Sequence, residues 1–185
     1  MGLLSFLRKL KLKEKEIRIL LIGLDGAGKT TTLKQLKGES TEGIASTKGF
    51  NIETFQLGEV KLNVWDIGGQ SYIRPYWRNY FEETEGIVWV VDSTDHFRIQ
   101  EGISELEKVL KTEKLAGASL LVFANKQDIR GAMTPEEIAN SMKLTEIVQN
   151  RHWKIQASSA ITGEGVLPGF RWIVQDVCSR LFTFN

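Results

Sequence analysis

Residues 23–30 read GLDGAGKT and directly follow IRILLI at 17–22, an apolar run typical of a buried strand. Three glycines in this position let the backbone fold into a concave turn whose N–H groups converge. The stretch fits the pattern G-x-x-x-x-G-K-[ST], in which such a turn holds phosphate oxygens at the start of a helix. The sequence therefore predicts a phosphate-binding loop between a strand and a helix.

This loop supplies most of the side chains and N–H groups that we expect to contact a nucleotide. Lys29 offers a positive charge to the outer phosphates and is expected to act in catalysis, while the Thr30 hydroxyl is expected to bind Mg²⁺. The alternative to nucleotide binding is an ordinary glycine-rich turn that happens to precede a lysine. The motifs further along the chain decide between the two interpretations. The expected contacts from the loop are Gly23, Asp25, Gly26, Ala27, Gly28, Lys29, Thr30 and Thr31.

A second motif, DIGGQ at 66–70, follows the apolar run VKLNVW at 60–65. Asp66 stands at the end of this strand pattern, where P-loop NTPases place the carboxylate that supports Mg²⁺, here expected to act through water. Gly69 brings a backbone N–H close to the terminal phosphate without an intervening side chain. Gln70 then stands where its amide can orient an attacking water, so we expect it to be catalytic.

A third motif, NKQD at 125–128, identifies the base. It resembles the N-K-x-D element of guanine-nucleotide-binding proteins. The Asp128 carboxylate can accept from both N1–H and the 2-amino group of guanine, a donor pair that adenine lacks, so adenine would leave a buried charge unpaired. Lys126 can lay its methylene stem along the base, and Asn125 can tie this loop to the phosphate-binding loop.

Further along, Ser159 and Ala160 match an S-A element whose backbone N–H meets guanine O6. Together the motifs predict a site for GTP or GDP with Mg²⁺, in which glycines hold the phosphates. Each motif taken singly fits a solvated loop, but their order and their positions after strand patterns favour a guanine-nucleotide site.

Strand-like and helix-like patterns alternate along the chain. IVWVV at 87–91 and LLVFA at 120–124 are apolar throughout, as strands covered on both faces are. The alternation favours an α/β fold of the P-loop NTPase class, a mostly parallel six-stranded sheet with helices on both faces. The LG pair at 57–58 joins two strand patterns directly and predicts an antiparallel edge hairpin. We expect strands at 17–22, 50–57, 60–65, 87–91, 120–124 and 153–156, and helices at 30–37, 76–82, 99–111, 135–142 and 165–181.

The composition fits one soluble domain: 185 residues, 42% hydrophobic and 25% charged, with a net charge of +1 that gives no electrostatic case for binding nucleic acid. The single cysteine, Cys178, excludes an internal disulfide and fits a reducing compartment. We expect residues 1–16 to form an amphipathic helix and linker, because apolar residues of 2–10 recur on one helical stripe. Residues 17–185 are expected to form the nucleotide-binding domain, as a monomer.

On these motifs, the chain resembles the ADP-ribosylation-factor-like small GTPases along nearly its whole length. The stretches that carry the resemblance are GLDGAGKT, TKGFNIE, LNVWDIGGQ, IRPYWRNYF, VVDSTD, NKQD and SAITGEG. The resemblance implies that Thr47 binds Mg²⁺ and senses the γ-phosphate. It also implies that Phe50, Trp65 and Tyr80 form an aromatic effector patch, although these three side chains also fit ordinary core packing.

The same resemblance implies the partners and the location. It predicts a GTPase-activating protein, effectors at the switch and interswitch surface, the tubulin-folding cofactor D, and prenyl-binding carrier proteins that release lipidated cargo. It implies a cytoplasmic protein that also visits membranes, the centrosome or microtubule-associated structures. Phe6 stands where the myristoylation pattern has Ser or Thr, so membrane contact is expected to be weak or transient.

Three other functions fit parts of the pattern. A nucleotide-binding module without hydrolysis would not need Gln70, and a P-loop kinase would not need NKQD. A membrane-recruited GTPase of vesicle traffic shares every motif and differs in its acyl anchor. No arginine has a clear role on the γ-phosphate, because Arg74 and Arg78 fit surface positions equally well. We therefore expect hydrolysis to be slow without an activating protein.

Overall fold

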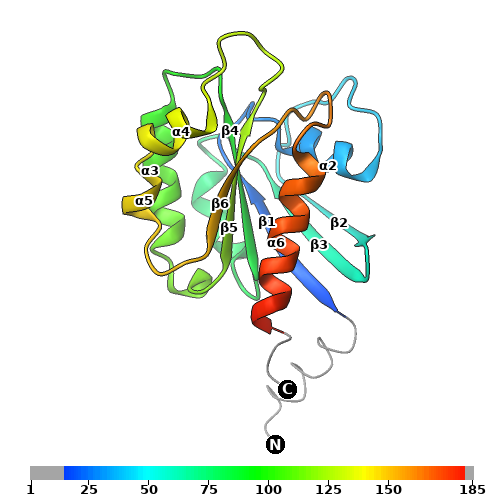
Figure 1. Cartoon of the computed structure of the whole chain (residues 1–185). Coiled ribbons are helices and arrows are strands. Elements are labelled where there is room, and N and C mark those ends of the chain that lie inside the picture. The colour runs from blue at the N-terminus through cyan, green and yellow to red at the C-terminus, as the bar shows by residue number, and fades with distance from the viewer. Residues whose placement is uncertain (1–14, 182–185) are drawn as a thin grey trace, which may run out of the picture.

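A six-stranded sheet in the order β2-β3-β1-β4-β5-β6 runs through the centre of the protein, with helices on both faces (Figure 1). The structure is a computed structural model and describes residues 15–181. Its strands are β1 (Glu16–Ile22), β2 (Phe50–Leu57), β3 (Val60–Ile67), β4 (Gly86–Asp92), β5 (Ser119–Asn125) and β6 (Trp153–Ala157). Its helical segments are α2 (Lys29–Lys37), η1 (Arg74–Tyr80), α3 (Ile99–Leu110), η2 (Glu113–Leu115), α4 (Pro135–Ser141), α5 (Leu144–Ile147) and α6 (Val166–Leu181).

The sheet separates two apolar cores, because successive side chains of a strand point to opposite faces. On one face Leu20 and Trp89 pack with residues of α3, α4 and α5. On the other face Ile19 packs with α2 and α6, where Phe170 is fully buried and lies 5.7 Å from Phe123 between ring centroids. Both faces of the central strands are covered, so their uniformly apolar sequences follow from the architecture.

The edge hairpin of β2 and β3, here called the interswitch hairpin, is antiparallel, with Leu57 opposite Val60 across a two-residue turn. Gly58 in this turn has φ +62°, a conformation that glycine adopts readily. Along β3, Val60, Leu62 and Val64 are buried while the residues between them are partly exposed. The predicted hairpin and its alternation are confirmed.

Strands β1, β3, β4, β5 and β6 pair in parallel, so their carboxyl ends share one edge of the sheet. The loops that follow these strands gather at the upper end of the molecule in Figure 1. This edge is where ligands bind in open α/β sheets.

The predicted fold class is confirmed, with differences at the ends of elements. β1 begins at Glu16, inside the segment assigned to the linker, and β3 continues through Asp66 to Ile67. The helical segment predicted at 76–82 lies at Arg74–Tyr80, and the short η2 and α5 were not expected. The predicted N-terminal helix lies in 1–14, outside the described residues. Within 15–181, no helix is both long and apolar enough to cross a membrane.

The contact between α6 and β5 leaves no room for a side chain at Gly169, where a Cβ would lie 2.5 Å from Phe123 Cε1. We expect Gly169→Ala to lower the free energy of unfolding by about 1–3 kcal/mol through overpacking. Gly102 in α3 is the control, because its Cβ would meet only Leu24 Cδ1, at 3.9 Å. Gly102→Ala should raise stability by up to about 1 kcal/mol through helix propensity. Urea unfolding measures the free energy of unfolding of both variants. Equal stabilisation by the two substitutions would contradict the close contact of Gly169 with Phe123.

Candidate nucleotide-binding site

The loop between β1 and α2 has a backbone that only glycine allows at two points. Gly23 has φ +148°, and a Cβ there would lie 2.4 Å from the carbonyl oxygen of Val90. Gly28 has φ +96° and caps α2, and a Cβ there would lie 2.4 Å from Asn125 Nδ2. The N-terminus of α2 therefore opens directly into the loop, as an anion site at a helix end requires.

Lys29, the first residue of α2, folds back beneath this loop. Its ammonium donates to the carbonyl oxygens of Gly23 at 3.1 Å and Leu24 at 2.9 Å. Burial lowers the pKa of Lys29 to about 8, although the carboxylates of Asp66 and Asp25 oppose the shift. A buried cation gains from an anionic partner, so phosphate oxygens at this loop would stabilise its charged form.

Three oxygen-bearing side chains from separate segments meet beside the loop. The Thr30 hydroxyl donates to Asp66 Oδ2 at 2.6 Å and lies 2.8 Å from the Thr47 hydroxyl. Asp66 Oδ1 is buried and has no hydrogen-bond partner among residues 15–181. Burial raises the pKa of Asp66, against the opposing effect of the Thr30 hydrogen bond. A hard cation with oxygen ligands fits this set, because it would satisfy the orphaned oxygen and favour the ionised carboxylate.

The segment after β3 packs tightly against the phosphate-binding loop. A Cβ on Gly69 would lie 2.3 Å from the Gly23 carbonyl oxygen and 2.5 Å from the Asp25 nitrogen. Only glycine permits this approach of two backbones. Gln70, next along the chain, lines a pocket of about 220 Å³ beside this loop. The complete lining is Asp25, Gly26, Gly28, Lys29, Thr30, Thr31, Ile44, Ala45, Ser46, Thr47, Gly69 and Gln70.

The sequence left open whether Arg74 lies on the surface, and the structure excludes this because the side chain is only 7% exposed. It donates to the Gly69 carbonyl oxygen at 2.7 Å, to Glu101 at 2.6 Å and to Asp25 at 3.3 Å. Arg98 also pairs with Asp25, at 3.0 Å. Partial burial raises the pKa of Asp25, but Arg98 and Arg74 outweigh it and hold the pKa below its usual value. Arg78 is exposed, as expected.

The predicted base-binding residues form a second, connected group. Asn125 Nδ2 donates to the Ala27 carbonyl oxygen at 2.8 Å, which is the predicted tie between the two loops. Asn125 Oδ1 accepts from the Ala160 N–H at 3.0 Å, so a guanine O6 would have to share that donor. The Ser159 hydroxyl donates to Asp128 Oδ1 at 2.7 Å and orients the carboxylate.

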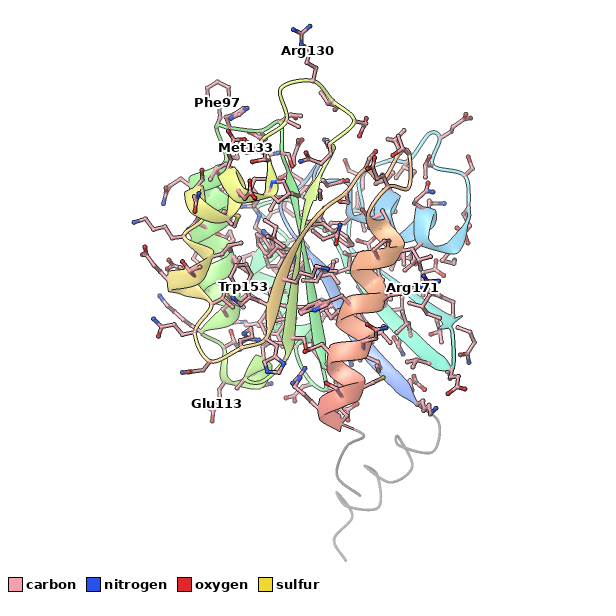
Figure 2. All side chains as sticks on the ribbon, in the orientation of Figure 1. Phe97, Glu113, Arg130, Met133, Trp153 and Arg171 are labelled. Atoms are coloured by element: carbon pink, nitrogen blue, oxygen red, sulfur yellow. The ribbon has the colours of Figure 1, made fainter. Side chains whose placement is uncertain are left out.

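Sequence reasoning missed Asp92, which ends β4 and accepts from Lys126 Nζ at 2.6 Å. This ion pair holds the side chain of Lys126 in place. The backbone of Lys126 has φ +68°. The sequence feature that could have identified Asp92 is its position at the carboxyl end of a strand pattern, in VVDSTD. Figure 2 shows Phe97 and Arg130 projecting from the loops after β4 and β5 at this same end of the molecule.

The glycine loop before α2, the Thr30–Asp66 pair that fits a cation and the loop that carries NKQD lie on one sheet edge, an arrangement typical of guanine-nucleotide-binding P-loop proteins. The chain belongs to the ADP-ribosylation factor family, whose model matches residues 3–177. It is 56% identical to ADP-ribosylation factor-like protein 2 of Arabidopsis thaliana and 54% identical to that of Dictyostelium discoideum, over 100% of each chain. The resemblance to the ADP-ribosylation-factor-like branch is thereby confirmed.

A solved structure also matches. The Arl6 BBS3 small GTPase from Trypanosoma brucei, with the bound nucleotide analogue GppNp, superposes with a TM-score of 0.81 at 36% identity. The match covers 90% of this chain and 99% of that one. Members of the family bind GTP or GDP with Mg²⁺ and hydrolyse GTP, so this protein is a small GTPase that acts as a GTP-binding switch.

Asp128→Asn should change the base preference from guanine to xanthine, because an amide cannot accept from both ring donors of guanine. A competition assay between GTP and XTP measures the preference. Ser159→Ala is the control, since it removes only the hydroxyl that orients Asp128. That variant should weaken GTP binding up to about tenfold and keep the guanine preference. An unchanged preference in Asp128→Asn would refute the assignment of the base loop.

Lys29→Met should stabilise the nucleotide-free protein while abolishing nucleotide binding. Since the pKa of Lys29 is about 8 in the folded protein and 10.5 ordinarily, the unfolded chain binds more protons than the folded protein between about pH 8 and 10.5. The wild type therefore gains stability from this group as the pH rises from 8 toward 10.5. The advantage of Lys29→Met should be roughly 3 kcal/mol at pH 7 and shrink by pH 9.5. Urea unfolding with chelator measures it, and a constant advantage would contradict the burial argument.

Proposed function

We propose that this small GTPase hydrolyses GTP slowly with Gln70 and Lys29 as its catalytic residues, and that its GTP form engages effectors through the switch segments and the interswitch hairpin. The observation that carries this proposal is the meeting of Thr30, Thr47 and Asp66 beside the phosphate-binding loop. Thr47 comes from a separate loop, so a ligand that needs its hydroxyl would order that loop. This is the requirement for a switch that senses the γ-phosphate.

The chain's own residues account for the chemistry by positioning and charge. Lys29 lies beneath the loop and would stabilise charge on the outer phosphates. Gln70 lines the pocket and would orient the attacking water through its amide. Mg²⁺ held by Thr30, Thr47 and, through water, Asp66 would neutralise phosphate charge.

Neither arginine near the loop is available to supply further charge. The guanidinium of Arg74 is occupied by Gly69, Glu101 and Asp25. That of Arg98 is occupied by Asp25 and Asp95. Unassisted turnover should then be on the order of 10⁻⁴ s⁻¹ or slower, and an activating protein should supply the missing charge.

The aromatic patch expected from the sequence supports an effector surface. Phe50 is 50% exposed, and its ring lies 5.1 Å from that of Tyr80 and 6.1 Å from that of Trp65. Arg18 lies over Trp65 at 3.9 Å and braces the patch from β1. Trp65 and Tyr80 are only partly exposed and pack against the core, so the patch consists of an exposed phenylalanine backed by two half-buried rings. Such an aromatic side chain beside a switch loop is suited to binding a partner.

We infer that the partners include the tubulin-folding cofactor D and prenyl-binding carriers of lipidated cargo. The support is the full-length similarity to ADP-ribosylation factor-like protein 2 together with the aromatic patch. We further propose a monomer in the cytoplasm, with peripheral contact at membranes, the centrosome or microtubule-associated structures.

A pull-down with defined partners tests the effector proposal. Gln70→Leu loaded with GTP should retain purified cofactor D or a prenyl-binding carrier, and the GDP-loaded protein should not. Phe50→Ala in the GTP form is the second variant, because the Phe50 ring packs with Trp65 and Tyr80 and does not line the nucleotide pocket. It should keep nucleotide affinity and lose at least tenfold in partner affinity. Equal capture by the GTP and GDP forms would refute the switch-dependent interaction.

Gln70→Leu should abolish partner-stimulated hydrolysis and leave GTP affinity within a few-fold of the wild type. The substitution removes the amide that orients water but leaves each predicted phosphate donor in place. Single-turnover hydrolysis with an activating protein measures the rate, and nucleotide dissociation measures the affinity. Comparable stimulated rates in variant and wild type would overturn the catalytic assignment.

Deletion of residues 2–10 should speed GDP release and raise GTP affinity relative to GDP. These residues lie outside the described part of the chain, and their amphipathic pattern together with the alternation of β3 motivates the prediction. Val60, Leu62 and Val64 of β3 share a buried face, so sliding the interswitch hairpin by two residues keeps each face where it was. We propose that the N-terminal segment competes for one of these registers. An unchanged GDP off-rate and nucleotide preference in the truncated protein would favour a solvated tail.

A further inference from the structure

The backbone of Gln70 is held on both sides, so its side-chain torsions are the freedom that remains. The Gly69 carbonyl oxygen accepts from Arg74 at 2.7 Å, and Gly69 itself packs against the phosphate-binding loop. The Gln70 carbonyl oxygen accepts from the Ile73 N–H at 2.8 Å, which begins the following turn. The orientation of the Gln70 side-chain amide is therefore set by the hydrogen bonds of its terminal oxygen and nitrogen atoms.

One such bond comes from Tyr72, whose hydroxyl donates to Gln70 Oε1. The Tyr72 side chain is 61% exposed, and the residue does not belong to the lining of the nucleotide pocket. The oxygen of the amide is therefore drawn toward a group outside the pocket that Gln70 itself lines.

This bond competes with the role of Gln70 in hydrolysis. Oε1 is the acceptor of the glutamine side chain, and an attacking water must donate to it in order to be oriented. A tyrosine hydroxyl on the same oxygen fixes the amide plane and occupies one lone-pair direction. A water in line with the γ-phosphate can then use this oxygen only in the orientation that the hydroxyl allows.

We propose that Tyr72 restrains Gln70 in the resting protein and thereby slows unassisted GTP hydrolysis. This inference rests on the proposed catalytic role of Gln70. Tyr72 acts as a positioning residue, through Gln70 and without touching the nucleotide. An activating protein that engages this exposed tyrosine would release the amide, so the restraint also makes hydrolysis dependent on the partner.

Tyr72→Phe tests the restraint by removing a single oxygen. Loss of one neutral hydrogen bond corresponds to a roughly two- to tenfold change in rate. We expect unassisted single-turnover hydrolysis to rise by that factor, with GTP and GDP affinities unchanged. An unchanged rate would overturn the proposal. A slower rate would overturn it as well, since it would mean that Tyr72 prepares Gln70 for attack.

Tyr76→Phe is the matched control. Tyr76 lies in the adjoining η1, is 60% exposed, and its hydroxyl has no hydrogen-bond partner within the described chain. Removing the hydroxyl oxygen of Tyr76 should leave the rate of unassisted GTP hydrolysis unchanged. If Tyr76→Phe raised the rate as much as Tyr72→Phe, the specific bond to Gln70 would be refuted.

A double-mutant cycle separates this inference from the proposed function. In the Gln70→Leu background Tyr72→Phe should change nothing, because the bond it removes no longer exists. An equal acceleration in that background would overturn the restraint. Failure of Gln70→Leu itself to lower stimulated hydrolysis would instead refute the catalytic role of Gln70. Equal thermal unfolding temperatures of Tyr72→Phe and the wild type would show that the hydrolysis rates are compared between equally folded proteins.

Discussion

One buried amide, that of Asn125, holds the two halves of the nucleotide site together. It donates to the Ala27 carbonyl oxygen of the phosphate-binding loop and accepts from the Ala160 N–H of the loop after β6. Gly28 leaves the space that this side chain occupies. Because a buried amide strongly prefers to satisfy its donors and acceptors, the three loops are fixed relative to one another. Base and phosphate recognition therefore share one rigid frame at the sheet edge.

The switch side of the site is organised by charge. Asp25 places a carboxylate in the phosphate-binding loop, where it would repel a triphosphate, and Arg74 and Arg98 balance it. Arg74 extends the same network to the Gly69 carbonyl oxygen and to Glu101 of α3. The network ties the segment after β3 to the loop and pairs the guanidinium groups of both Arg74 and Arg98 with carboxylates. This arrangement is the reason for proposing that rapid hydrolysis depends on an external partner.

The fold and most of the candidate site follow from local patterns. Uniformly apolar runs predicted the covered strands, the LG pair predicted the edge hairpin, and the glycines of 23–30 predicted a concave turn. The structure shows positive φ at all three of those glycines. The tie from Asn125 to the phosphate-binding loop was also anticipated. The ends of elements were less predictable, because hydrogen bonding carried β3 past its apolar pattern to Ile67. Asp92 was missed, since its role depends on a lysine 34 residues away.

By itself, the sequence determined the class of fold, the chemistry of the loops and the choice of guanine. Side-chain periodicity, glycine's access to positive φ and the donor pattern of a base are local properties, which a chain carries in its residue order. Only the tertiary structure decided that Arg74 is buried between Gly69, Asp25 and Glu101. It also decided that the hydroxyl of Tyr72 meets Gln70. Such contacts depend on where packing places separate segments and side-chain torsions, and residue type alone does not specify that placement.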